Sequence, residues 1–197
     1  MLVFGAIMQY SEEKCRWLFP EIIPSYLGRL VLGDWRARAA SVLSPQTKLI
    51  LVSGGVDLNP KTQKKDSRAV ELAKLIESYG VPQDMLRAIG KPENGNVRGN
   101  ILNLLEYVHN NPEVKKVGML CPRFQMERAK LVLYSELGGF THPTVDFTWI
   151  EVENTLIDAD PSFRTNVNSV YSSEHAAVCY KMEKNGIRDL LSGQYKN

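Results

Sequence analysis

Long apolar runs are missing from this chain. No stretch of its 197 residues approaches the ~20 consecutive apolar residues that a membrane-spanning helix needs, so we predict no membrane span. The opening run from Met1 to Met8 is too short for a signal-peptide core with its flanks, and no basic segment precedes it. We therefore interpret this run as a first strand and expect a cytoplasmic protein.

Cysteine is scarce and unpaired in sequence. The chain has three cysteines, Cys15, Cys121 and Cys179, and none of them forms a Cys-x-x-Cys pair. An odd number without that spacing argues against a disulfide framework or a zinc ribbon and favours a reducing compartment. The three histidines are far apart in sequence and lack the spacing of metal ligands, so we expect no metal site.

The chain also has no large excess of positive or negative side chains. Lys and Arg number 24 against 22 Asp and Glu, which leaves a net charge of +2. The densest basic run, from Lys61 to Arg68, falls in a predicted loop. A nucleic-acid-binding protein usually concentrates its basic residues on one face, so we expect no nucleic-acid partner.

Several catalytic and nucleotide-binding motifs are absent as well. The sequence contains no G-x-x-x-x-G-K-[ST] loop and no G-x-G-x-x-G loop, which argues against ordinary ATPase and dinucleotide sites. It also has no G-x-S-x-G element of the serine hydrolases.

What the chain does contain is an alternation of short apolar runs and helix-length amphipathic segments. The predicted strands are 1–8, 48–53, 85–89, 116–121 and 146–152, and helices are predicted at 34–43, 66–79, 101–109, 123–137 and 173–191, with helical character also at 11–19. Asp34 is the expected cap of the helix 34–43, and Gly186 is expected to break or kink the last helix.

This order predicts an α/β protein with a Rossmann-like, doubly wound, mostly parallel sheet of about five strands and helices on both faces. We expect a single domain over residues 1–197 that ends in a C-terminal helix. The segment 142–173 is the least regular part of the sequence, and a flap or a homodimer contact are the alternatives for it.

Ligands of such folds bind beyond the carboxyl ends of the strands. The first polar segment expected there begins with Gly54 and Gly55, directly after a buried strand. Glycine allows close backbone approach, and its N–H groups can hold a phosphate or carboxylate. Asn59 is a further candidate contact, and Asp57 is the candidate base. The alternative is a plain turn between strand and loop.

The second segment is rich in asparagine and opens a helix. Asn96, Arg98 and Asn100 are candidate ligand contacts, because a helix N-terminus carries partial positive charge and free N–H donors. The alternative is that Asn96 merely caps the helix.

The third segment, Pro122–Arg128, also opens a helix. Arg123 and Arg128 are candidate anion clamps, since guanidinium groups bind carboxylates and phosphates in bidentate fashion, and Gln125 is a candidate neutral contact. The alternative is that these arginines pair with Glu127 or Glu136.

Five short motifs occur in an order that is similar to one bacterial family. They are Arg36–Leu43 (R-x-x-A-A-x-x-L), Val52–Gly55, Tyr79–Pro82 (with G-V-P), Asn96–Asn100 (compare N-T-x-E-N) and Phe124–Ala129 (compare F-H-M-x-R-A). Through them the chain resembles the YdcF/SanA/ElyC family of Rossmann-like proteins. The resemblance implies a function related to the cell envelope and S-adenosylmethionine as a candidate cofactor.

The chain departs from the family pattern at three polar positions. Arg68 and Gly99 stand where the family has glutamate, and Gln125 stands where it has histidine. Neither Gly nor Gln takes up and releases a proton near neutral pH, so acid–base chemistry is in doubt. Two hypotheses remain. One is a site for a nucleotide-like or phosphorylated small molecule, with or without transferase or hydrolase activity, and the other is a non-catalytic protein-interaction member of the family.

Overall fold

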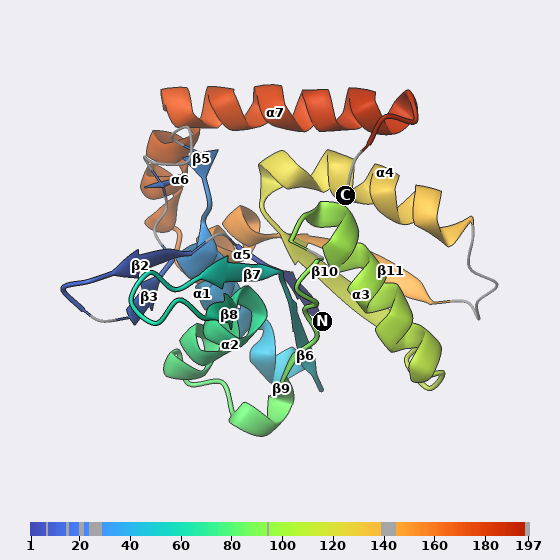
Figure 1. Cartoon of the computed structure of the whole chain (residues 1–197), viewed down its shortest axis with the longest axis horizontal. Coiled ribbons are helices and arrows are strands. Elements are labelled where there is room, and N and C mark those ends of the chain that lie inside the picture. Colours follow the sequence, from blue (N-terminus) through green and yellow to red (C-terminus); the bar gives the residue numbers. More distant parts are fainter. Residues whose placement is uncertain are drawn as a thin grey trace.

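A five-stranded parallel sheet forms the centre of the protein (Figure 1). The computed structural model describes residues 1–6, 8–14, 16–19, 22–23, 29–93, 95–138 and 145–195. The strands lie in the order β11–β10–β1–β6–β9, with bounds Asp146–Glu151, Lys116–Cys121, Leu2–Phe4, Ile50–Ser53 and Leu86–Ala88. The chain therefore winds outward in one direction from β1 to β9 and in the other from β10 to β11. The strand order reverses between β1 and β10, which is where such folds place their ligands.

The central strands are buried on both of their faces. Alternate side chains point to opposite faces, so Val3, Val52 and Leu120 enter one apolar core. Phe4 and Met119 enter the other core. The near-continuous apolar runs that predicted these strands follow from this double burial.

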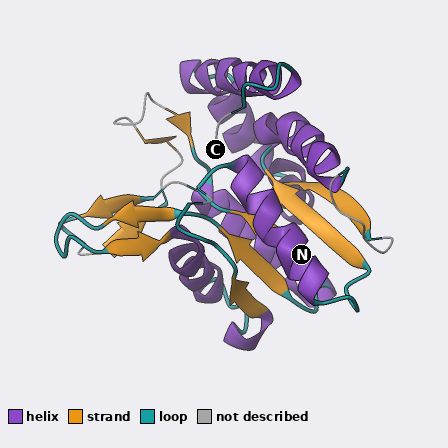
Figure 2. Ribbon diagram, turned by 45° about the vertical axis from the view of Figure 1, so that its right-hand side comes forward, coloured by secondary structure: helices purple, strands orange, loops and turns teal. Residues whose placement is uncertain are grey.

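Helices cover both faces of the sheet, as predicted (Figure 2). One core holds side chains of α1, α2, α5 and α6, and the other holds side chains of α3 and α4. The bounds of these helices are Gly33–Leu43, Arg68–Ser78, Val152–Ala159 and Phe163–Tyr171 for the first face, and Val97–Asn110 and Arg123–Leu137 for the second. Short 3-10 turns follow α1 (Ser44–Gln46) and precede β9 (Gln83–Met85).

The last helix, α7 (Glu174–Leu191), lies across the top of the view in Figure 1 and contacts α4, α6 and β5 (Arg29–Leu30). The expected break at Gly186 is wrong, because α7 continues through it. A Cβ at this position would lie 2.9 Å from Cδ of Arg128. Glycine is present here because the helix packs closely against that arginine.

The helical character expected over residues 11–19 is also wrong. β2 (Gln9–Ser11) and β3 (Arg16–Leu18) form an antiparallel pair instead. The Trp17 indole N–H donates to a carboxylate oxygen of Asp66 at 2.7 Å, on a second hairpin made by β7 (Val56–Leu58) and β8 (Lys65–Ser67). This contact spans 49 positions, so local periodicity does not reveal it. β4 (Ile22–Ile23) pairs with β5 in a third short hairpin.

Other expectations need smaller corrections. The segment 142–173, expected to be irregular, contains β11, α5 and α6 from residue 146 on. Helices as short as α5 and α6 show too few turns for their period to stand out in the sequence. Asp34 does not cap α1. It lies in the first turn, and the cap is Leu32, with φ at 51°. Cys15, Asn94 and His142 lie outside the described residues.

The structure also bears on membrane insertion. Among the residues described, no helix is both long and apolar enough to cross a bilayer.

Candidate functional site

The loops at the carboxyl ends of the strands are pressed together through glycines. A Cβ at Gly5 would lie 2.3 Å from the carbonyl oxygen of Ser53, and a Cβ at Gly90 would lie 1.9 Å from that of Gly54. A Cβ at Gly55 would lie 2.6 Å from Cα of Gly95. These distances are too short for any other residue, so glycine is what lets the loops after β1, β6 and β9 touch.

The expected ligand contacts at Gly54 and Gly55 are absent from the cavity, and the diglycine has a structural role. Gly54 and Gly55 are buried, and neither lines the cavity described below. Gly55 supports Gly95, which does line it. The two glycines thus position the asparagine-rich segment from behind.

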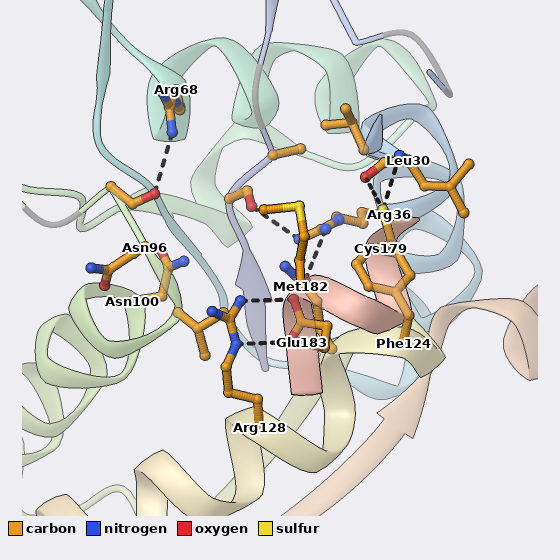
Figure 3. A pocket seen from close by; sticks show the side chains of 16 residues that line it. Leu30, Arg36, Arg68, Asn96, Asn100, Phe124, Arg128, Cys179, Met182 and Glu183 are labelled. Atoms are coloured by element: carbon orange, nitrogen blue, oxygen red, sulfur yellow. Dashed lines mark hydrogen bonds and ion pairs between the residues drawn. The ribbon is translucent and has the colours of Figure 1, made fainter. Parts of the chain in front are cut away.

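A cavity of about 250 Å³ opens at this edge of the sheet. In Figure 3, Arg68 lies above it, Arg128 below it, Asn96 and Asn100 to the left, and Arg36 towards the right. Loops and helices from the whole length of the chain contribute lining residues. The polar ones are Arg36, Arg68, Asn96, Asn100, Gln125, Arg128 and Glu183, and the apolar side chains include Leu30, Val31, Phe124, Cys179 and Met182.

Arg36, from the first turns of α1, is the most buried of the cavity's charged groups. Its side chain donates to the carbonyl oxygens of Phe4 and Gly5, at 3.0 and 2.9 Å, and to the amide oxygen of Gln125 at 2.9 Å. Among the described residues, no carboxylate lies within ion-pair distance of it. Burial lowers the pKa of Arg36 to about 10, so it keeps its positive charge at neutral pH.

Arg68, by contrast, has a carboxylate partner. It donates from two of its nitrogens to Asp57, at 2.8 and 2.5 Å, and from a third to the carbonyl oxygen of Gly95 at 3.3 Å. Asp57, the expected base, is not among the cavity's lining residues and is held by this bidentate pair. Through these hydrogen bonds, Asp57 orients the guanidinium group of Arg68.

Arg128, on α4, is bound by a carboxylate of the last helix, α7. It donates to Glu183 at 2.8 Å, and a second contact joins the Arg128 Nε and a Glu183 carboxylate oxygen at 2.7 Å. It also donates to the hydroxyl of Tyr195 at 3.3 Å. The pair ties the C-terminal helix to α4, and it places one carboxylate in a cavity lined by three guanidinium groups.

The asparagines meet the cavity at the start of α3. Asn96 is the N-cap, and its side-chain oxygen accepts from the Gly99 N–H at 2.8 Å, as the capping alternative predicts. Asn96 lines the cavity as well. Asn100 is only 4% exposed, and its Oδ1 has no hydrogen-bond partner among the described residues.

Two of the predicted arginines point away from the cavity. Arg98 pairs with Glu136 of α4, with Nε and a carboxylate oxygen 2.6 Å apart. Arg123 pairs with Glu151 at 3.1 Å, and neither arginine lines the cavity. Arg123 and Arg128 do pair with glutamates, as the alternative predicts, but with Glu151 and Glu183 in place of Glu127 or Glu136.

Asn59 also serves a local purpose. Its side-chain oxygen accepts from the N–H groups of Lys61 and Thr62, and its amide donates to Asp66. It therefore stabilises the turn between β7 and β8 and does not line the cavity.

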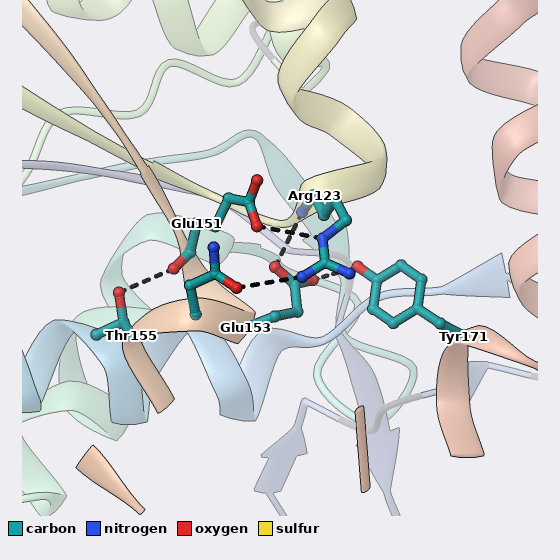
Figure 4. A network of polar contacts seen from close by, with 6 residues as sticks. Arg123, Glu151, Glu153, Thr155 and Tyr171 are labelled. Carbon is teal, nitrogen blue, oxygen red and sulfur yellow. Dashed lines mark hydrogen bonds and ion pairs between the residues drawn. The ribbon is translucent and has the colours of Figure 1, made fainter. Parts of the chain in front are cut away.

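A separate polar network surrounds Arg123 (Figure 4). Glu153, in the first turn of α5, is fully buried, and its carboxylate accepts from the backbone N–H of Arg123 at 3.0 Å and from the Tyr171 hydroxyl. Burial raises the pKa of Glu153 and also that of Tyr171. This carboxylate already occupies the N-terminus of α4, so an anionic ligand is not expected at that helix end.

Comparison with known proteins assigns the chain to no family. The chain matches no protein-family model, no curated protein and no solved structure. The resemblance to the YdcF/SanA/ElyC family therefore stays a prediction, and what is established is the Rossmann-like α/β architecture.

Several lining residues of the cavity are not among those that the sequence predicts. Arg36 is one of them, and the sequence does carry a signal for it, because it lies among the apolar positions of the predicted helix 34–43. Glu183 and Met182 come from a helix whose contact with α4 had no signal in the sequence. Among the residues that the structure describes, no group of three or more His, Cys, Asp or Glu side chains is placed to hold a metal ion.

Proposed function

We propose that this protein binds a small anionic molecule, such as a phosphorylated metabolite, in the cavity at the carboxyl ends of β1, β6 and β10. The observation that carries the proposal is Arg36. It is a buried cation whose partners are two backbone carbonyls and one neutral amide. The carboxylates of Glu153 and Glu183 are near enough to favour the charge of Arg36, but neither contacts it directly. Burying a charge without a directly paired counter-ion is costly, and an anionic ligand would offset that cost.

The surroundings of the cavity support this reading. Three guanidinium groups face one carboxylate, and the N-terminus of α3 adds its partial positive charge on the Asn96 side. Strand order reverses between β1 and β10, so the cavity lies where Rossmann-like folds bind their ligands.

The polar groups present favour binding over turnover. Asp57 is engaged by Arg68 and Glu183 by Arg128, and the cavity's described lining includes no histidine. The proposal is therefore a binding function. A transferase or hydrolase step would need an acid or base that the ligand itself brings. A non-catalytic protein-interaction role is the alternative if no small molecule binds.

The test is a thermal-shift panel on the full chain with three kinds of anion: inorganic phosphate, ribose 5-phosphate and nucleoside diphosphates. S-adenosylmethionine, which has no net negative charge, is measured beside them to test the cofactor that the family resemblance implies. A ligand at 100 times its Kd stabilises the folded state by about 2.7 kcal/mol. Arg36→Met should weaken binding by about 10- to 100-fold, because a hydrogen bond to a charged group contributes about 1.5–3 kcal/mol.

The matched control is Arg38→Met. Arg38 lies on the same helix but is bound to Asp34 and Tyr79 outside the cavity, so this variant should bind like the wild type. Circular dichroism checks that both variants fold, and Arg128→Met serves as the second cavity variant. If no compound shifts the wild type, or if both cavity variants bind as well as the wild type does, the proposal is wrong.

A further inference from the structure

Four buried side-chain atoms at the cavity have no hydrogen-bond partner among the described residues, and two of them, the Nε of Arg128 and a carboxylate oxygen of Glu183, face each other as an ion pair at 2.7 Å. The other two are of opposite kinds, one a donor and one an acceptor. Neither the Nε of Arg36 nor the Oδ1 of Asn100 has a hydrogen-bond partner among the described residues. The two residues are 2% and 4% exposed, and both line the same cavity. Buried polar groups in folded proteins are almost always hydrogen-bonded, so an unmet donor and an unmet acceptor at one cavity call for an explanation.

The two atoms need different partners. Arg36 is a cation and a donor, and it is matched by an anionic oxygen. The amide oxygen of Asn100 accepts only, so it is matched by an O–H or N–H group. A fully ionised oxyanion satisfies Arg36 and offers nothing to Asn100. A ligand that meets both must carry an anionic group and a hydrogen-bond donor.

The carboxylate of Glu183 is a second hydrogen-bond acceptor at the cavity, and it restricts the chemical class of the ligand further. Glu183 is held by Arg128 on one side, and its carboxylate would repel a second anionic group and accept from a hydroxyl. Hydroxyl groups are therefore favoured on the part of the ligand that faces α3 and α7. The anionic group is favoured near Arg36, the one of the three lining arginines that is without a carboxylate partner among the described residues.

The volume limits the size of the ligand. The cavity has a volume of about 250 Å³. It is smaller than the ~300 Å³ at which pockets for drug-sized ligands begin. A dinucleotide is too large for this space, whereas a hydroxylated acid or phosphate of three to six carbons has a suitable size.

From these observations we infer that the ligand is a small polyhydroxylated anion of the sugar-phosphate or sugar-acid type, with its anionic group on Arg36 and a hydroxyl on Oδ1 of Asn100. This inference rests on the proposed function and names the chemistry of its ligand.

The experiment is isothermal titration calorimetry of the full chain with two matched pairs of probes. Glycerol 3-phosphate is compared with propyl phosphate, and glycerate with propionate. Each pair shares its anionic group and differs in its hydroxyls, and the two pairs together distinguish a phosphate from a carboxylate. We expect the hydroxylated member of at least one pair to bind about tenfold or more tightly, the order of cost for leaving a buried acceptor unmet.

Asn100→Leu has close to the same size and removes the acceptor, so the tenfold preference should fall to about one. The control is Asn103→Leu on the same helix. Asn103 is buried and donates to the Ser53 hydroxyl at 2.9 Å without lining the cavity, so this variant should keep the preference. The wild-type comparison stands by itself if Asn100→Leu does not fold.

The outcomes separate the two claims. Equal affinities within both pairs, or a preference that persists in Asn100→Leu, would overturn the inference and leave the binding function in place. A wild type that binds none of the four probes would also overturn the inference. A wild type that in addition binds no compound of the thermal-shift panel would overturn the binding function as well.

Discussion

Replacing Gly55 by alanine tests whether the diglycine positions the site from behind. The added Cβ would lie 2.6 Å from Cα of Gly95 and 3.0 Å from its nitrogen, whereas carbon atoms in contact prefer about 3.5–4.0 Å. The carbonyl oxygen of Gly55 accepts from the Arg68 N–H at 2.9 Å, which holds this loop in place. The neighbouring loop must therefore retreat by about 1 Å.

The expected cost follows from the kind of atoms that meet. Both contacts are backbone atoms, which cannot rotate away as a side chain would, so we expect the ~1–3 kcal/mol typical of overpacking in Gly55→Ala. The retreat also moves Asn96, the residue after Gly95, which caps α3 and lines the cavity. A displacement of ~1 Å in a binding group is enough to weaken binding strongly.

Urea unfolding measures the first effect, and calorimetry with the tightest-binding anion measures the second. The control is Gly138→Ala, where the nearest atom to the added Cβ is the Ser135 oxygen at 3.6 Å and φ is −61°, so stability should change by less than about 0.5 kcal/mol. If Gly55→Ala is as stable as Gly138→Ala and binds the anion equally well, the close-approach argument fails.

Two further predictions concern the network of Figure 4. Burial raises the pKa of Glu153 in the folded state, so folding favours the protonated form of this carboxyl. At neutral pH the buried charge lowers the stability of the protein. This cost disappears as the pH falls through the raised pKa towards 4.5, the ordinary pKa of the group. Urea unfolding at several pH values should therefore show the wild type gaining stability relative to Glu153→Gln on acidification, and a constant difference would contradict this. Arg123→Ala removes a half-exposed pair with Glu151 and should cost less than about 1 kcal/mol in thermal unfolding. It should also leave anion binding unchanged in calorimetry, because Arg123 does not line the cavity, and a loss of binding would restore Arg123 to the site.

Local sequence patterns were sufficient for most of the sheet and its helices. The apolar run 116–121 coincides with β10, and the amphipathic segment 123–137 coincides with α4. Gly80 directly follows the predicted helix 66–79, and its φ of 90° is typical of a glycine after a helix end. These features depend on neighbours within one or two turns, so a sequence pattern can carry them. The alternation of strands and helices then leads to the doubly wound sheet, because few other arrangements bury both faces of such strands.

The short elements could not be predicted in the same way. The β2–β3 hairpin depends on contacts such as that between Trp17 and Asp66, which are distant in sequence. Its strands are three residues each, so neither shows enough alternation to outweigh a helical pattern.

For the site, the sequence by itself determined which segments gather at the carboxyl ends of the strands, since parallel strands bring all their following loops to one edge. Only the tertiary structure decided which arginines face the cavity. Arg98 and Arg123 form ion pairs with glutamates on neighbouring elements. Arg128 pairs with Glu183, 55 positions away, and Arg36 is buried and donates to Gln125. The reason is that an arginine forms an ion pair only with a carboxylate within about 4 Å. Which carboxylate lies that close depends on how the helices and strands pack, and this is decided by the folded chain.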